Sequence, residues 1–427
     1  MESKIRRVCH LAAFLAISLS VQPAVAADPA NRDESEVSAY ELPELLRFED
    51  GSQVRTAADW RKRRTEVLGL FEEHVYGRTP KEPFPSIEYS QLEKPTAAFG
   101  GSAIREQIRI TMGGELHADV LIYRPAGKTK GTFIGLNFRG NHTVQPDPEI
   151  VLNENWMPSD DKIGIIDHRA TDKSRGTSSR RWPMKMITDQ GYAVATCFCG
   201  DFDPDKYQNS FDDGVHKLFY ANGQTKPADN EWGSIGAWAW GLSRILDYLQ
   251  TRDDLESKNV VAFGHSRLGK TSLWAGAQDT RFRITISNNS GCGGAALFRR
   301  RFGERLDIMA ERFPDWFCVN HWQHVNREDQ MPVDQHMLIA LMAPRAVYIA
   351  SAQDDTWADP RGEFLAGLNA NPVYHLLGRP GLEAASMPAV NTPVGGTIGY
   401  HIRTGGHDVT DFDWQQYLKF ADKHFAN

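Results

Sequence analysis

Several features that mark metal enzymes are missing from this sequence. It has no H-E-x-x-H motif, and no set of cysteines and histidines is spaced as in a zinc site. His321 and His324 are close enough to share one face of a helix, but no obvious third ligand accompanies them. We therefore predict that the protein has no metal site and needs no cofactor, and that both histidines are structural.

Positive charge and long apolar runs are also scarce. Asp and Glu outnumber Lys and Arg by 55 to 48, which gives a net charge of −7, and the basic residues form no stripe. This balance argues against nucleic acid as a partner. The only long apolar run lies near the start of the chain, and internal repeats, low-complexity tracts and linkers are absent. We expect one domain without a membrane span, and we expect it to be a monomer.

The first residues form a pattern typical of an export signal. Lys4, Arg6 and Arg7 precede a mostly apolar run from Val8 to Val21, and Ala24-Val25-Ala26 offers a small-x-small cleavage site. The apolar run is short for a transmembrane helix. We therefore predict a signal peptide over residues 1–26 and a protein that is periplasmic or secreted. An uncleaved membrane anchor is the alternative.

Few cysteines remain once the signal is removed. The mature chain, residues 27–427, is predicted to form a single domain and keeps Cys197, Cys199, Cys292 and Cys318. An even number of cysteines in an oxidising compartment permits disulfides, but the pairing cannot be deduced from sequence. Cys197 and Cys199 share one face of a predicted strand and are poorly placed to bond to each other. Four buried free thiols are the alternative.

Apolar runs alternate with helical patterns along the mature chain. Buried strands are predicted at Gly131–Phe138, Tyr192–Phe198, Val260–Phe263, Ile284–Ser287, Ala346–Ser351 and Gly399–Arg403. Helices are predicted at Trp60–Tyr76, Trp232–Gln250 and Met331–Met342, and an antiparallel hairpin at Ile104–Ile110 and Ala118–Tyr123. Proline and glycine between residues 370 and 398 predict a long surface loop. The alternation predicts an α/β fold, a three-layer αβα sandwich with a mostly parallel central sheet.

Ser266 lies between a predicted strand and a predicted helix. The run Val260–Phe263 ends at a glycine, and Leu268–Ala277 contains helix formers and no proline. In a nucleophile elbow, the serine stands on such a turn at the end of a parallel sheet, and Gly264 and Gly269 would leave room for its strained backbone. The usual G-x-S-x-G spacing would place the second glycine at position 268, where this chain has leucine. We predict that Ser266 is a nucleophile; an ordinary turn serine is the alternative.

A serine nucleophile needs a base and a carboxylate that orients the base. In the α/β-hydrolase order both lie downstream, each in a loop after a strand. His407 follows two glycines just beyond the last predicted strand, whereas His401 lies inside that strand, where a base is harder to aim. Asp354 and Asp355 follow the strand Ala346–Ser351. The chain order therefore predicts His407 as the base and leaves the choice between the two aspartates open.

Further motifs extend the pattern around the serine. They are Gly264-His265-Ser266-Arg267-Leu268-Gly269-Lys270, Ser290-Gly291-Cys292-Gly293-Gly294, Trp316-Phe317, Pro332-Val333-Asp334-Gln335-His336, Ala340-Leu341-Met342-Ala343-Pro344-Arg345 and Gly406-His407. With these motifs the chain resembles the glucuronoyl esterases of carbohydrate esterase family 15, over most of the mature chain from the segment Val75-Tyr76-Gly77-Arg78 onward. The resemblance implies an α/β-hydrolase domain that cleaves esters between 4-O-methylglucuronate on xylan and lignin alcohols. The expected substrate is thus a glucuronoxylan or lignin–carbohydrate ester.

The resemblance also implies roles for individual residues. Many fungal members carry a Glu just before the Ser-Gly-x-Gly-Gly segment, where this chain has Asn289. The resemblance therefore implies the arrangement of bacterial members, with Asp355 as the acid in a Ser-His-Asp triad. It further implies Arg267 at the oxyanion site, where a guanidinium favours the charged tetrahedral intermediate over the uncharged ester. The residues implied to hold the sugar are Lys270, Glu304 and Trp357.

Other functions remain open at this level. A carbohydrate esterase of the acetyl-xylan type would use the same triad with a smaller acyl pocket. A non-catalytic carbohydrate-binding protein on a hydrolase fold is an alternative of a different class, although an intact triad argues against it. A secreted lipase has no support, because no long apolar lid is visible.

Overall fold

The computed structural model describes residues 30–426 except 82–83, 209–210 and 222. The predicted signal peptide, residues 1–26, lies outside the described residues. Within them, no helix combines the length and the apolar character that crossing a membrane would require.

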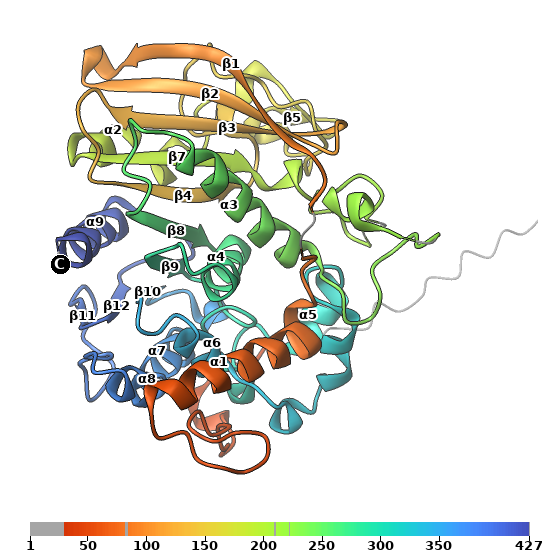
Figure 1. The fold of residues 1–427 in the computed structure, drawn as a ribbon, viewed down its shortest axis with the longest axis vertical. Coiled ribbons are helices and arrows are strands. Elements are labelled where there is room, and N and C mark those ends of the chain that lie inside the picture. Colours follow the sequence, from red (N-terminus) through yellow and green to blue (C-terminus); the bar gives the residue numbers. More distant parts are fainter. Residues whose placement is uncertain (1–29, 82–83, 209–210, 222, 427) are drawn as a thin grey trace, which may run out of the picture.

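One large mixed sheet organises the described part of the chain (Figure 1). Its order is β1 (Ile87–Ala98), β2 (Ala103–Met112), β3 (Leu116–Pro125), β7 (Tyr192–Phe198), β4 (Gly131–Asn137), β8 (Val260–His265), β9 (Ile284–Asn288), β10 (Ala346–Ala352), β12 (Ile398–Arg403) and β11 (Val394–Gly395). The run from β7 to β12 is parallel, and antiparallel pairs lie at both ends. The mostly parallel central sheet predicted from the sequence is confirmed, as is the antiparallel hairpin of β2 and β3.

Helices cover both faces of this sheet. In β4, Phe133 packs into the core cluster that also contains residues of α2 (Met184–Asp189) and α9 (Asp411–Phe425), whereas its neighbour Ile134 packs into the cluster on the opposite face. The opposite face is covered by α3 (Ser234–Gln250) and α4 (Arg267–Gln278). Because strands covered on both sides have no solvent face, every residue of β4 and β7 is buried.

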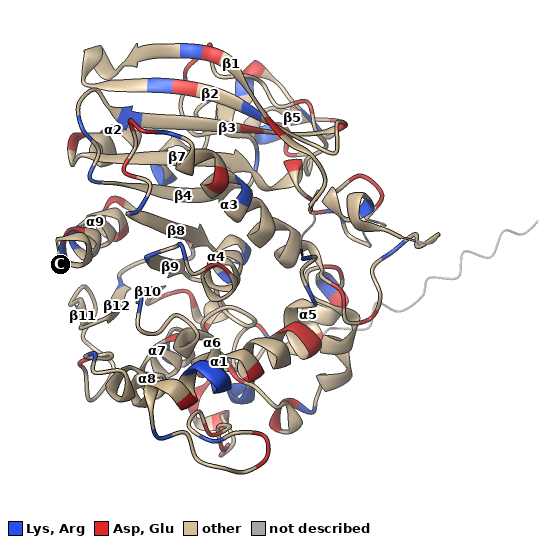
Figure 2. Ribbon diagram, viewed as in Figure 1, with Lys and Arg blue, Asp and Glu red and all other residues tan. Residues whose placement is uncertain are grey.

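The distribution of charged residues over the sheet also reflects burial. Figure 2 shows no Lys, Arg, Asp or Glu in the central strands β7, β4, β8, β9 and β10, whereas the outer strands β1 to β3 carry both signs. Ionised groups are rarely buried without partners, and an apolar run is therefore the expected sequence of a central strand. This explains why β7 was predicted residue for residue, while the largely exposed and polar β1 was not predicted at all.

Several helices differ from their predicted bounds. Helix α1 spans Ala57–Phe71 because Thr56 and Asp59 form a capping box, and the chain continues as a wider turn over Glu72–Tyr76. At Gly77 (φ 80°) a side chain would lie 2.2 Å from the Glu231 carbonyl oxygen, so the predicted end at this glycine has a steric cause.

The predicted helix Met331–Met342 and the predicted loop at 370–398 both need correction. Only α6 (Gln335–Ala340) is helical in the first region, because the Asp334 side chain accepts the Gln335 N–H and caps the start. The second region begins with α8 (Asn371–Leu376), which buries Tyr374. The remaining helices are α5 (Leu306–Arg312) and α7 (Pro360–Asn369).

The four described cysteines are free and buried. Cys197 lies in β7, but Cys199 lies just beyond that strand in a short helical turn. The prediction that the two share one face of a strand is therefore wrong. Burial raises the pKa of the Cys318 thiol to about 12. Of the two alternatives left by the sequence, the structure has four buried free thiols.

Candidate active site

Three predicted site residues lie in loops at the same edge of the parallel sheet. Ser266 follows β8, Asp355 follows β10, and His407 follows β12. Parallel strands end at a common edge, and ligand sites of α/β sheets form there. Residues from three distant parts of the sequence are thus brought to one place by the topology alone.

The backbone at Ser266 has the strained geometry of a nucleophile elbow. Its φ is 58° and its ψ is −131°, and its N–H donates to the Asn288 carbonyl oxygen at 2.9 Å. A side chain on Gly264 would lie 1.8 Å from the Leu268 carbonyl oxygen, so this position accepts only glycine. Helix α4 begins immediately after the serine.

The late glycine in the motif also has a structural reason. Leu268 is 1% exposed and packs into the core beside α3, so a glycine there would leave a cavity. One position later, a side chain on Gly269 would lie 3.0 Å from the Ser290 Cβ and 3.2 Å from the Asn288 carbonyl oxygen. Residue 269, and not residue 268, therefore lies on the side of α4 that faces the end of β9.

His407 and Asp355 form a direct contact. The His407 Nδ1 lies 2.7 Å from the Asp355 Oδ2, and the two side chains are 37% and 3% exposed. Because a carboxylate only accepts hydrogen bonds, this contact places the imidazole proton on Nδ1 and leaves Nε2 as the acceptor. Asp354 differs: it is exposed, and its backbone N–H donates to the Gly405 carbonyl oxygen in the His407 loop.

Asn289 contacts the same carboxylate, a role that sequence reasoning missed. Its Nδ2 donates to the Asp355 Oδ2 at 2.6 Å, and its side chain is 1% exposed. Its φ of 48° is a left-handed conformation that asparagine adopts more readily than most residues. The oxygen that accepts from His407 therefore also accepts from an amide at the end of β9.

The loop that carries His407 is held from two sides. Arg403 donates to the carbonyl oxygens of Thr404, Gly406 and Asp408, and its Nε donates to the Asp413 Oδ2 at 2.7 Å. On the outer side, the Asp408 carboxylate pairs with Arg181 at 2.8 Å and also with Arg180. These contacts fix the backbone on either side of the imidazole.

The His265 ring lies next to the imidazole of His407. Its ring centroid is 4.6 Å from that of His407, and its Nδ1 lies 2.6 Å from the Asn288 Oδ1. Burial lowers the pKa of His265 well below its ordinary value. A neutral ring in this position packs against His407 without adding charge beside it.

Ser266, Arg267 and His407 line one cavity of about 370 Å³. Its rim includes Phe138, and arginines 139, 180 and 181 also contribute to the wall. The Arg267 guanidinium pairs with Asp205 at 2.7 Å, and its Cζ lies 4.6 Å from the Phe138 ring centroid. The cavity thus combines a serine hydroxyl, an imidazole and fixed positive charge at the start of α4, where backbone N–H groups lack helical acceptors.

The three residues implied to hold the sugar are connected to one another but are not part of the lining of this cavity. Lys270 Nζ donates to the carbonyl oxygens of Ser290 and Cys292 and to the Glu304 Oε2, at 2.5–2.7 Å. The Glu304 N–H donates to the Trp357 carbonyl oxygen at 2.8 Å. All three ammonium hydrogens of Lys270 therefore have protein acceptors, and its side chain is 2% exposed. None of the three is among the described residues that line the cavity.

A second buried carboxyl supports the segment after β9. Glu363 accepts from the N–H groups of Ser290 and Gly291 and from the Ser351 hydroxyl, and burial raises its pKa to about 8. Like Asn289, it had no signal in the sequence, because two of its partners, the N–H groups of Ser290 and Gly291, lie 73 and 72 residues away along the chain.

The histidines first considered as metal ligands contact a third histidine instead. His321 Nδ1 lies 3.0 Å from the His74 carbonyl oxygen, and His324 Nε2 lies 3.3 Å from the His74 Nδ1. Over the described residues, no group of three or more His, Cys, Asp or Glu side chains is arranged to hold a metal ion.

Known proteins share both the sequence and the architecture. A family model described as "Glucuronyl esterase, fungi" matches residues 184–378. The carbohydrate esterase MZ0003 of an unknown prokaryotic organism is 48% identical over 99% of each chain. A 4-O-methyl-glucuronoyl methylesterase of Schizophyllum commune is 29% identical over 86% of this chain and 82% of its own.

Solved structures agree. A CE15 esterase from a marine bacterial metagenome superposes with a TM-score of 0.86 at 49% identity and covers 93% of this chain and 100% of its own. A glucuronoyl esterase from Solibacter usitatus has a TM-score of 0.85 at 43% identity and covers 91% of this chain and 99% of its own. The chain therefore belongs to the glucuronoyl esterases of carbohydrate esterase family 15, and its fold is that of an α/β-hydrolase.

Proposed function

We propose that this chain is a serine esterase that hydrolyses esters of glucuronic or 4-O-methylglucuronic acid. The observation that carries the proposal is the 2.7 Å contact between His407 Nδ1 and Asp355 Oδ2, at a cavity that His407 shares with Ser266. Membership of the glucuronoyl esterases supports the acyl group, because relatives in this family are named 4-O-methyl-glucuronoyl methylesterases.

In the first half of the reaction, the Ser266 hydroxyl attacks the ester carbonyl and His407 Nε2 takes its proton. The Asp355 carboxylate keeps the imidazole in the required tautomer and stabilises the imidazolium. The tetrahedral intermediate collapses when the alcohol leaves with the proton from His407, and the uronate remains as an ester on Ser266. Water then repeats the attack with His407 as base, which releases the free uronic acid and restores the serine.

The oxyanion forms at the N-terminus of α4. The backbone N–H of Arg267, the residue after the nucleophile, is one donor of the usual α/β-hydrolase oxyanion hole. The Arg267 guanidinium adds a charge that Asp205 and the Phe138 ring hold in place. Because the ester is uncharged and the intermediate is negative, this charge stabilises the transition state more than the bound substrate.

The sugar is the part of the substrate for which we propose the connected set Lys270, Glu304 and Trp357. Since the hydrogens of Lys270 already have protein acceptors, its contribution is to fix Glu304 and the carbonyl of Ser290. Direct contact with sugar hydroxyls then belongs to Glu304 and Trp357. This refines the role implied by the family resemblance.

We also propose glucuronoxylan or lignin–carbohydrate esters as the natural substrates, and export as the route to them. Export is supported by the charged and apolar pattern of residues 1–26, and a polymeric wall component is found outside the cell. A monomeric state is part of the same proposal.

One pair of assays tests the function. Benzyl glucuronate should be cleaved with much higher kcat/KM than an acetylated xylan, and Ser266→Ala should abolish the activity while the protein remains folded. Equal efficiency on both substrates would favour the acetyl-xylan type. Failure of wild-type Ser266 to react with a phosphonate probe would instead favour a non-catalytic carbohydrate-binding protein.

A further inference from the structure

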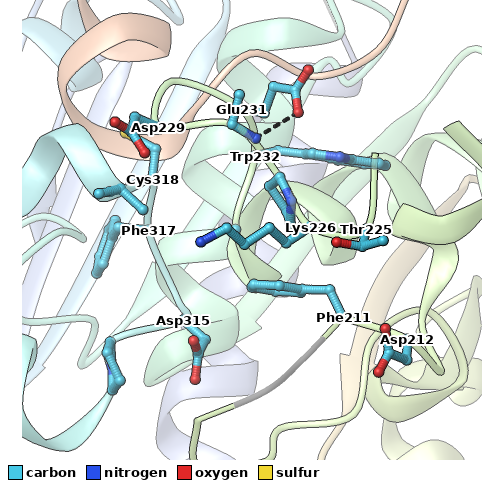
Figure 3. A pocket seen from close by; sticks show the side chains of 15 residues that line it. Phe211, Asp212, Thr225, Lys226, Asp229, Glu231, Trp232, Asp315, Phe317 and Cys318 are labelled. Carbon is cyan, nitrogen blue, oxygen red and sulfur yellow. Dashed lines mark hydrogen bonds between the residues drawn. The ribbon is translucent and has the colours of Figure 1, made fainter. Parts of the chain in front are cut away.

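A second cavity of about 490 Å³ is lined by residues 211–212, by residues between 225 and 233, and by residues between 314 and 319 (Figure 3). This volume is within the range of small-molecule sites in proteins. In the view of Figure 3, Lys226 extends between Phe211 and Trp232, and its ammonium points toward the side formed by Asp315 and Phe317. The cavity shares no lining residue with the one that contains Ser266.

Trp316 connects this cavity to the active site. Its chain neighbours Asp315 and Phe317 line the cavity, and its own ring lies 5.6 Å from the Arg267 Cζ and 5.9 Å from the Lys270 Nζ. Its Nε1 donates to Asp205, the partner of Arg267. Trp316 therefore joins this cavity to both Arg267 and Lys270, the second of which belongs to the set that we propose for the sugar, whereas arginines 139, 180 and 181 do not line it.

The charges in this cavity exclude most ligand classes. Four carboxylates, those of Asp212, Asp229, Glu231 and Asp315, accompany a single ammonium, so an anion such as a second uronate is disfavoured. A purely apolar ligand would have to desolvate these ionised groups. The carboxylates accept hydrogen bonds and the ammonium donates them, and a sugar hydroxyl can serve as the partner of both.

Two of these groups are available for a ligand. Within the part of the chain that the structure describes, the ammonium of Lys226 and the carboxylate of Asp229 form no hydrogen bond or ion pair, and both side chains are exposed. Phe211 and Val319 add partly exposed apolar surface. A pyranose, with hydroxyls at its edge and an apolar face, matches this combination.

We propose that this cavity binds neutral sugar units of the polysaccharide chain that carries the esterified uronate. The inference rests on the proposed function, and it assigns the substrate as a polymer or oligomer rather than a small ester. A chain of sugars is supported as the ligand because this cavity borders a third one. The third cavity has a volume of about 630 Å³, and both cavities are lined by Glu231 and Trp232.

The test compares two substrates that differ only in the attached chain. One is benzyl glucuronate, and the other is a xylo-oligosaccharide that carries a benzyl-esterified 4-O-methylglucuronate. Lys226→Ala should raise the KM for the oligosaccharide about tenfold, as expected for loss of a hydrogen bond from a charged group, and leave kcat/KM for benzyl glucuronate unchanged. Asp229→Asn should act in the same direction. Lys128→Ala, an exposed lysine in the turn between β3 and β4, is the matched control.

A binding experiment separates this inference from the proposed function. Xylotetraose titrated into the Ser266→Ala protein should bind, and Lys226→Ala in that background should weaken the affinity about tenfold. Absence of xylotetraose binding at millimolar concentration, or an equal effect of Lys226→Ala on both esters, would overturn the inference. Absence of benzyl glucuronate hydrolysis by the wild-type enzyme would instead contradict the proposed function.

Discussion

Two histidine–aspartate pairs in the described part of the chain, His407–Asp355 and His401–Asp413, differ mainly in their surroundings. His407 and Asp355 meet at 2.7 Å in a loop at the sheet edge, where the His407 side chain is 37% exposed. His401 and Asp413 meet at 2.9 Å with both side chains fully buried. In the buried pair the other imidazole nitrogen, Nδ1, lies 3.0 Å from the Tyr348 hydroxyl, whereas no described residue forms a hydrogen bond with His407 Nε2.

The difference shows what separates a base from a structural contact. A base needs one ring nitrogen that is open to the substrate, and a partner that fixes the other. His401 has protein partners at both nitrogens, and its strand gives it no access to a cavity. The same two residue types therefore hold the core together at one position and are available for proton transfer at the other.

The largest expected effect on turnover comes from the pair at the sheet edge, His407 and Asp355. His407→Ala should lower kcat by about 10⁴-fold, because no other group can take the serine proton. Thermal unfolding should be nearly unchanged, since the side chain is partly exposed. Retention of more than about a tenth of wild-type kcat would mean that another residue is the base.

Replacement of Asp355, the proposed acid, should have the second largest effect on kcat. Asp355→Asn should lower kcat by about 10³- to 10⁴-fold, because an amide no longer enforces the tautomer with a proton on Nδ1. Asp354→Asn is the matched control, since Asp354 contacts the His407 loop through its backbone only. Similar losses in the two variants would contradict the assignment of Asp355.

The buried pair should affect stability rather than chemistry. Asp413→Asn removes the partner of two buried groups, His401 and Arg403, and breaking such a contact costs about 3–5 kcal/mol. Urea unfolding should show this loss, whereas Asp411→Asn, exposed in the same first turn of α9, should change little. Unchanged stability of Asp413→Asn would remove the distinction between the two pairs.

A smaller effect is expected at Asn289. Asn289→Leu should lower kcat by about 10- to 100-fold, the value of one hydrogen bond to a charged group. Asn289→Asp is more informative, because two adjacent carboxylates share one proton at low pH and repel each other when both are ionised. Its kcat relative to wild type should therefore fall as the pH rises. A ratio that does not depend on pH would show that Asn289 does not act through Asp355.

The smallest effect concerns pH and stability. Burial lowers the pKa of His401 below its ordinary value, although Asp413 opposes this. Below about pH 6.5, the unfolded chain therefore binds a proton at residue 401 that the folded chain does not bind. The free energy of unfolding consequently decreases as the pH falls through this range. His401→Gln should reduce the difference in unfolding free energy between about pH 7.5 and about pH 5.5. An unchanged difference would mean that His401 is not the source.

Much of this arrangement could be predicted from the sequence. Central strands are buried on both faces and therefore form continuous apolar runs, and β7 and β10 were recognised in this way. The order of serine, aspartate and histidine after three of these strands followed directly. Individual residue choices were harder, and the preference for Asp355 over Asp354 came from the family resemblance rather than from spacing.

What could not be predicted depends on contacts between distant segments. The Asn289 amide reaches Asp355, 66 residues away, only because β9 and β10 are neighbours and because residue 289 adopts a left-handed φ. Lys270 was expected at the sugar, which stays a prediction, and no pattern in the sequence indicated that its ammonium donates to the carbonyl oxygens of Ser290 and Cys292. Strand β1 is polar and largely exposed, and the start of α6 is set by the Asp334 cap, so neither feature depends on an apolar pattern.

The contact between Asn289 and Asp355 also has an evolutionary consequence. The side chains that follow two adjacent strands, Asn289 and Asp355, meet at the carboxylate oxygen that also contacts the His407 imidazole. A carboxylate at position 289 would therefore lie close to the same imidazole. A lineage in which both positions were acidic would retain an ionised partner for the base throughout the exchange. With Asp355 as the proposed acid, the acid would therefore be able to move from one strand to the next by single substitutions, without an inactive intermediate between the two arrangements.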